Sequence, residues 1–163
     1  DAAILARAKR AMDRRLAAAW EQRATGLPFK TPDEALIMAS IVEKETGQAS
    51  ERAMIAGVFV NRLRLGMLLQ TDPSVIYGMG AAFDGNLRKR DLLADGPYNS
   101  YTRTGLPPTP IALPGRASIE AALRPANTSA LYFVSRGDGT SHFSATLAEH
   151  NRAVDTYQRC CRR

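Results

Sequence analysis

Residues 31–47 read TPDEALIMASIVEKETG and predict one helix with clear ends. Thr31 and Glu34 have the spacing of a capping box, and Pro32 suits the first helical position. Gly47 is the expected stop. At about 100° per residue, the apolar side chains between these ends point in nearly every direction. A helix that is apolar all round belongs inside a protein, so this helix is expected to be buried and central.

The last turn of this helix carries two carboxylates, Glu43 and Glu45. Carboxylates there face the negative end of the helix dipole, where cations are favoured. An acid placed against both burial and the dipole is expected to keep its proton to higher pH, as a general acid needs near neutrality. The alternative is exposure, or pairing with one of the 22 basic residues. The helix alone leaves the choice between the two glutamates open.

The sequence predicts five further elements besides this helix. Residues 2–24 predict an amphipathic helix, and residues 51–65 a second apolar helix that forms a core pair with the first. Residues 117–124 predict a short helix, and residues 131–144 a β-hairpin with a Gly-rich turn. Thr146 and Glu149 form a second capping box, for a C-terminal helix running to about residue 159. The predicted fold class is α+β and mainly helical.

Residues 66–116 are rich in turn formers and predict a long segment with little regular structure. Such segments are usually functional or disordered, and the apolar and aromatic anchors here argue against disorder. Polar groups suited to sugar hydroxyls stand among the aromatic rings, so a carbohydrate groove is one interpretation. The other is that each tyrosine is a half-buried loop anchor. Asp72, followed by Pro73, is expected to make a turn of the Asx type.

The whole chain has 163 residues and a formal charge of +6. The length suits one domain with a small appendage. The charge favours an anionic partner, such as nucleic acid, an acidic polymer or a membrane face, although no nucleic-acid motif is found. Cys160 and Cys161 are adjacent and fit neither a long-range disulfide nor a metal site. No signal peptide or membrane-length apolar run is present, and the missing initiator Met makes the chain look like an excised fragment.

Among reaction types, carboxylate acid–base chemistry is what remains. The histidines His142 and His150 have no obvious nucleophile to activate, and there is no GxSxG elbow. No phosphate loop and no set of metal ligands are found, so neither a metal nor a cofactor is expected.

Long motifs in order resemble the endolytic murein transglycosylases, the MltG or YceG-like family. They are ASIVEKET (39–46), SER (50–52), VFVNRLRLGMLLQTDPSVIYGMG (58–80), YNSYTRTGLPPTPIALPG (98–115) and HFSATLAEHN (142–151). The resemblance covers roughly residues 30–158. It implies a lysozyme- or transglycosylase-like groove, with residues 31–163 as the catalytic domain. Residues 1–30 would be a linking helix left from an N-terminal LysM-like module.

The resemblance also implies an activity. The enzyme would be a carbon–oxygen lyase that cleaves the β-1,4 bond between N-acetylmuramic acid and N-acetylglucosamine in nascent glycan strands, leaving 1,6-anhydro ends and terminating polymerisation. The first glutamate of the EKET run, Glu43, would be the catalytic acid and then the base. One residue in both roles differs from the two-carboxylate pattern of glycoside hydrolases. Glu45 lies about 200° around the helix from Glu43, so it is expected to have a structural role or to contact the residues that touch the substrate.

The family resemblance further implies a location and partners. A single N-terminal transmembrane helix would anchor the full-length protein in the inner membrane, with the catalytic domain facing the periplasm; this chain would lack that anchor. Peptidoglycan strands would be the substrate, and peptidoglycan synthases possible partners by family analogy, with no nucleic acid. The residues expected to line the groove are Gln70, Asp72, Tyr77, Asn99, Ser100 and Tyr101.

Two other functions stay open. A muramidase-type hydrolase would use Glu43 as the acid and Asp72 to assist a water molecule. A non-catalytic scaffold would bind anionic cell-wall polymer or a synthase through its basic surface. A nucleic-acid module ranks last.

Overall fold

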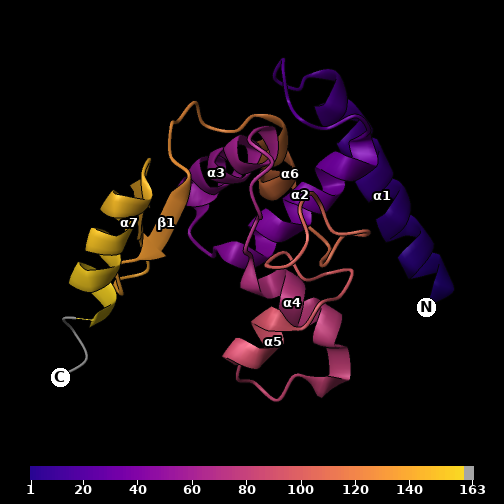
Figure 1. Cartoon of the computed structure of the whole chain (residues 1–163). Helices are drawn as coiled ribbons and strands as arrows, with labels where there is room; N and C mark the ends of the chain where they lie inside the picture. Colours follow the sequence, from indigo (N-terminus) through magenta and orange to yellow (C-terminus); the bar gives the residue numbers. More distant parts are fainter. Residues whose placement is uncertain (160–163) are drawn as a thin grey trace.

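The computed structural model describes residues 1–159, and its centre is a group of three helices (Figure 1). These are α2 (Pro32–Glu45), α3 (Arg52–Arg64) and α6 (Arg116–Leu123). Together with a two-stranded antiparallel sheet they confirm a mainly helical α+β fold.

The N-terminal end of α2 is as predicted, because the Thr31 hydroxyl accepts a hydrogen bond from the Glu34 N–H at 3.2 Å. Met38, Ile41 and Val42 are fully buried, which confirms the central helix. The helix ends at Glu45, with Thr46 as its extended C-cap, so Gly47 stands just past the end of the helix, where a stop glycine is expected. The two glutamates occupy this last turn, where both residues are partly buried.

Helix α3 packs closely on the rest of the core. Phe59 is 1% exposed and meets the ring of Phe133 edge-on at 5.9 Å. A side chain at Gly57 would lie 2.8 Å from the carbonyl oxygen of Ala126, so only glycine permits this approach to the segment that follows α6. Helix α3 is thereby fixed against the chain that leads into the sheet.

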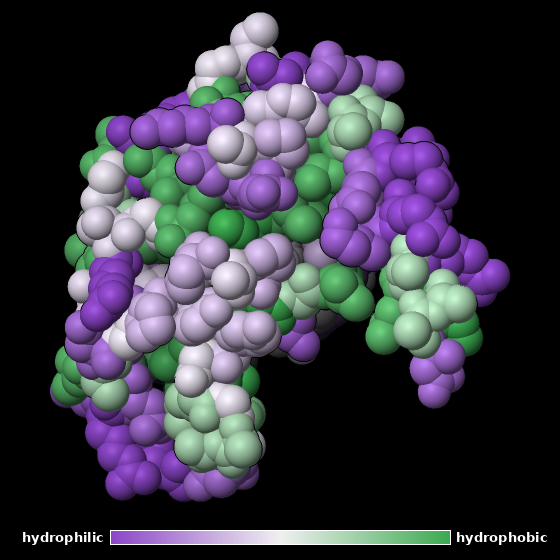
Figure 2. All heavy atoms as spheres, turned by 90° about the vertical axis from the view of Figure 1, so that its right-hand side faces the viewer, coloured by the Kyte–Doolittle hydropathy of each residue, from purple (hydrophilic) through white to green (hydrophobic). Residues whose placement is uncertain are grey.

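Helix α1 (Ala2–Glu21) lies along one side of the core and contributes Leu16 to it. Beyond its end, the Ala24 N–H donates to the Leu123 carbonyl at 2.9 Å. Its first turns expose Ile4 and Leu5, at 59% and 70%. Figure 2 views the molecule from the side of α1, where hydrophobic residues lie between hydrophilic ones. A boundary between residues 1–30 and 31–163 stays a prediction.

The expectation of little regular structure in residues 66–116 is wrong in two places. Helix α4 (Asp72–Met79) and the short α5 (Lys89–Leu93) form there. Asp72 and Pro73 open α4 instead of an Asx-type turn, because proline is tolerated in the first turn of a helix, where its missing N–H has no helical partner. Two local patterns, each shorter than three turns, were hidden by the surrounding glycines and prolines.

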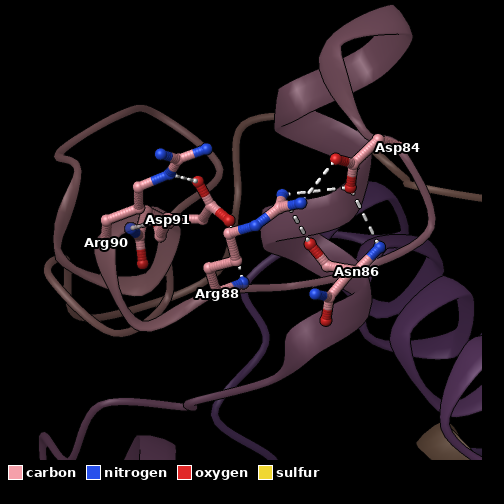
Figure 3. Close-up of polar contacts among 6 residues, drawn as sticks. Asp84, Asn86, Arg88, Arg90 and Asp91 are labelled. Atoms are coloured by element: carbon pink, nitrogen blue, oxygen red, sulfur yellow. Dashed lines mark hydrogen bonds and ion pairs between the residues drawn. The ribbon is translucent and has the colours of Figure 1, made fainter.

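Polar contacts hold the segment between α4 and α5 (Figure 3). The Arg88 guanidinium donates to both carboxylate oxygens of Asp84, at 2.7 and 3.1 Å, and the Arg88 N–H donates to Asp91 at 2.8 Å. Exposed pairs of this kind contribute little to stability, so they shape the loop rather than hold the fold together.

The predicted hairpin is confirmed as β1 (Tyr132–Ser135) and β2 (Ser141–Ser144), with Tyr132 opposite Ser144. Helix α7 (Leu147–Val154) packs on this sheet and begins at the predicted Thr146–Glu149 capping box; a π-helical stretch, Asp155–Arg159, follows. Cys160 and Cys161 lie outside the described residues. Within residues 1–159, no helix has the length and apolar character needed to cross a membrane.

Candidate active site

The side chain of Glu43 reaches from the end of α2 to the beginning of α6. Its Oε2 accepts hydrogen bonds from the Ser118 hydroxyl at 2.6 Å and the Gly115 N–H at 2.9 Å. These two bonds, that of Ser118 being the stronger influence, hold the pKa of Glu43 below its ordinary value. Free amides at a helix N-terminus favour a carboxylate in the same way.

The expectation that Glu43 keeps its proton to higher pH is therefore wrong. The sequence argument considered the unfavourable end of its own helix, whereas the favourable end of α6 faces this side chain. As a carboxylate, Glu43 links the end of α2 to the beginning of α6.

Glu45 points to a different side of α2 and has the opposite electrostatic character. Burial raises its pKa to about 7, against the effect of a hydrogen bond from the Thr71 hydroxyl to Oε1 at 2.5 Å. The negative charge of Asp72 also raises this pKa, and the positive charge of Arg62 lowers it. The acid with a proton to give near neutrality is thus Glu45.

Glu45 lines a groove of about 450 Å³. The end of α2 and the last turn of α3 form its base, the turn before α4 forms one wall, and β1 with α7 forms the other. The described residues that line it are Glu45, Arg62, Leu69, Gln70, Asp72, Tyr101, Tyr132, Phe133, Leu147, His150 and Asn151. Of the residues predicted to line a groove, Gln70, Asp72 and Tyr101 are brought together here, beside Glu45 rather than Glu43.

Asp72 and Tyr101 form one polar edge of this groove. The Tyr101 hydroxyl donates to Asp72 Oδ1 at 2.5 Å. Burial and the Asp72 contact raise the pKa of this tyrosine further above its ordinary value, so its hydroxyl stays protonated. Asp72 thus keeps a fixed orientation close to Glu45.

Ser100 lies behind the groove, where it holds Thr71. Its hydroxyl accepts the Thr71 N–H at 2.9 Å, and its carbonyl accepts the Gln70 N–H at 3.0 Å. Gln70 has φ of 52°, the left-handed region that non-glycine residues rarely adopt. Strain of this kind persists only where its surroundings impose it, and it is common at functional sites.

Asn99 and Tyr77 also lie outside the groove lining. The Asn99 side chain is 4% exposed and donates to the carbonyls of Asp91, Leu92 and Ala94, at 3.3, 3.1 and 2.7 Å. It orders the loop that carries Tyr101, whose N–H it accepts at 2.9 Å. Tyr77 is 47% exposed on α4 and packs edge-on against Tyr98.

Sequence reasoning missed the arginine and the second wall of the groove, formed by Arg62, Tyr132, His150 and Asn151. The rings of Tyr132 and His150 stack at 5.2 Å, and the Arg62 guanidinium lies 5.2 Å from the Tyr132 ring. One signal was present: Arg62 is a charged residue within a helix that otherwise reads as buried. The Tyr132–His150 contact joins distant segments and had no local pattern.

A second hollow, of about 270 Å³, lies between α1 and α6. Its acidic residue, Glu120, is half-exposed and pairs with Arg116 at 2.6 Å. No group of three or more potential metal ligands occurs among the described residues 1–159. The groove at Glu45 is the better candidate for chemistry.

Comparison with known proteins shows which proteins this chain is similar to. The chain is 49% identical over 122 residues to a Bacillus subtilis protein named endolytic murein transglycosylase, a match covering 75% of this chain and 34% of the relative. It is 34% identical over 129 residues to a Streptococcus pneumoniae protein of the same name, covering 76% and 23%. The chain thus spans about a third or less of these relatives.

A crystal structure of a yceG-like protein from Listeria monocytogenes has the same fold. It matches with a TM-score of 0.71 and 45% identity, over 76% of this chain and 40% of the other. The profile of the YceG-like family matches residues 1–156, from α1 to the π-helical stretch. The chain belongs to the YceG-like family.

Proposed function

We propose that this chain is the glycan-cleaving part of an endolytic peptidoglycan lytic transglycosylase, with Glu45 as the catalytic acid and base. The observation that carries the proposal is a single glutamate in a groove with its pKa raised to about 7. The name shared by the Bacillus and Streptococcus relatives supports peptidoglycan as the substrate.

The reaction balances with Glu45 alone. The protonated carboxyl gives its proton to the glycosidic oxygen as the bond from that oxygen to the muramyl anomeric carbon breaks. The N-acetylglucosamine side then leaves with a free 4-hydroxyl. The new Glu45 carboxylate takes the proton of the muramyl 6-hydroxyl while that oxygen attacks the anomeric carbon, which closes a 1,6-anhydro ring. No water is consumed, and Glu45 ends protonated as it began.

The Thr71 hydroxyl suits both halves of this cycle. It donates to Oε1 of Glu45 at 2.5 Å, so Oε2 takes no part in this bond. A hydrogen bond to the carboxylate form keeps Glu45 from becoming too weak an acid. Catalysis by such a group is most effective when its pKa lies near the working pH.

Site-directed substitution tests the assignment of the acid. Glu45→Gln, measured in the full-length protein on uncrosslinked glycan strands, is expected to reduce cleavage at least about a hundredfold. Glu43→Gln is the matched control on the same helix turn and should retain most activity, because an amide oxygen still accepts from Gly115 and Ser118. Loss of activity in Glu43→Gln with full activity in Glu45→Gln would return the assignment to Glu43.

A hydrolase is the second candidate, because Asp72 lies in the same groove as Glu45. In that reaction Asp72 would assist a water molecule, and the products would carry reducing ends. Mass spectrometry of the digested strands separates the two, since an anhydro product is lighter by one water. Reducing ends alone would exclude the transglycosylase reaction, and an inactive full-length wild type would favour a binding scaffold.

We also propose a cellular location and a partner for the full-length protein. A transmembrane anchor outside this chain would place the domain on the outer side of the cytoplasmic membrane, facing the periplasm, where nascent strands are made. Cleavage there would terminate glycan polymerisation beside a peptidoglycan synthase. Cell fractionation of the full-length protein and cross-linking to synthases would test both statements.

A further inference from the structure

Arg62 lies in the last turn of α3, at the base of the groove. The role inferred for it below rests on the proposed role of Glu45. It is 7% exposed, which is unusual for an arginine. Its guanidinium belongs to the groove lining together with Glu45 and Asp72. A buried cation in this position needs a physical reason.

Backbone carbonyls from both walls of the groove hold the guanidinium. Nε donates to the Leu131 carbonyl at 2.6 Å, at the start of β1. Nη1 donates to the carbonyls of Leu69 and Leu68, at 2.9 and 3.2 Å, in the turn that leads to Thr71. Arg62 therefore ties the Thr71 wall to the hairpin wall, and its own position is fixed.

The carbonyls accept from Nε and Nη1, and Nη1 also lies 3.4 Å from Gln70 Oε1, but none of these neutral groups neutralises the charge. Within residues 1–159, none of the ion pairs involves Arg62. Burying a cation without a paired anion is costly, and burial lowers the pKa of Arg62 from its ordinary value without removing the charge at neutral pH. The groove thus holds a positive charge that the resting site leaves without a contacting anion.

The other titratable groups around Glu45 cannot supply this charge. Asp72, in α4, opposes a negative charge on Glu45, and Tyr101, in the loop after α5, stays neutral. On the opposite wall, burial and the neighbouring Arg62 lower the pKa of His150, so it is neutral near pH 7, and Tyr132 is a phenol. Among the described groove residues, Arg62 is the fixed cation.

We propose that Arg62 is an electrostatic positioning residue: its buried cation is the counter-charge for the Glu45 carboxylate that exists between the two proton transfers. Before the first transfer Glu45 is neutral, and burial favours that form. After the transfer the carboxylate would be isolated beside Asp72, and the nearby guanidinium stabilises it. Arg62 thereby lowers the barrier to bond cleavage and sets the strength of the acid.

Two substitutions separate this electrostatic role from a purely structural one. Arg62→Gln keeps a polar side chain and removes the charge, whereas Arg62→Lys keeps the charge and loses most carbonyl contacts. Arg64→Gln is the matched control, because Arg64 lies two residues further along α3, is exposed, and among the described residues donates only to the Gly26 carbonyl, at 2.9 Å. Each variant is made in the full-length protein and checked for folding by circular dichroism.

Two readouts are then measured. The first is the titration of Glu45 by carbon-13 NMR of its carboxyl group, and the second is the pH profile of kcat/KM. In Arg62→Gln the Glu45 pKa and the basic limb of the profile should both move to higher pH, with kcat reduced about tenfold or more. In Arg62→Lys the limb should stay at its wild-type pH even if activity falls, and in Arg64→Gln nothing should move.

A folded Arg62→Gln with an unmoved Glu45 titration would overturn the inference. If Arg62→Gln does not fold, Arg62→Lys decides: a moved limb despite the retained charge would overturn it, and an unmoved limb supports it. Failure of the proposed function is a separate result, namely full activity of Glu45→Gln, and the NMR titration does not depend on it.

Discussion

The hydroxyl of Thr71, the residue before α4, donates a hydrogen bond to the carboxyl group of Glu45, the last residue of α2. Thr71 is 1% exposed, and its N–H is held by Ser100 at 2.9 Å. The donor is thus fixed before any substrate arrives. Such preorganisation is what a site needs to favour a charge that develops during reaction.

Thr71→Val removes this donor with little change of volume. The hydrogen bond favours the Glu45 carboxylate, so its loss should raise the Glu45 pKa and move the basic limb of kcat/KM to higher pH. We expect kcat to fall about tenfold, since a weaker acid transfers its proton less readily. Thr71→Ser, which retains the hydroxyl, is the control. A limb that moves equally in both variants would contradict this role.

Stability should depend on the protonation of Glu45 in the opposite sense to most carboxylates. Its pKa is about 7 in the folded protein and about 4.5 as a free group, so the folded state holds the proton more tightly. The stability this confers is present below about pH 4.5 and is lost as pH rises to 7. Glu45→Gln should therefore be more stable than wild type at pH 8, by roughly 1–3 kcal/mol, and close to wild type at pH 5. Urea unfolding at both pH values measures this, and a variant less stable at pH 8 would count against burial of the charge.

Glu43 should show the reverse pattern. Its folded-state pKa is lowered, chiefly by the Ser118 hydrogen bond, so its contribution to stability is present above its unfolded value and is lost as pH falls through the folded value. Glu43→Ala should cost about 1 kcal/mol at pH 7, a modest figure because water partly screens the site, and less at pH 3. Chemical unfolding at the two pH values is the measurement. An equal loss at both would assign the effect to packing rather than charge.

The helices and the hairpin could be predicted from sequence because their signals are local. Thr31 and Thr146 indicate where two helices begin, and the apolar side chains within residues 31–47 predict a core helix. The difference in pKa between Glu43 and Glu45 could not be predicted from sequence, because it depends on hydrogen-bond partners that are 72 and 26 residues away, Gly115 and Thr71. The family resemblance implied that the reaction takes place at this end of the helix, but it gave no information on the surroundings of each carboxyl group. Arg62 was hidden for the same reason, since its contacts at Leu131 are 69 residues away.

Asp72→Asn separates the two reactions that this groove can support. In a transglycosylase, Asp72 acts on Glu45 through its charge alone, and that charge raises the Glu45 pKa. The variant should keep forming anhydro products, and its basic limb should move to lower pH, the opposite direction to Arg62→Gln. The Tyr101 hydroxyl, now facing an amide oxygen, can still donate, so the loop should remain in place. In a hydrolase that uses Asp72 to assist water, the same variant would lose cleavage about a hundredfold or more, with no product of either kind. Product mass and pH profile from one enzyme preparation therefore decide between the reactions.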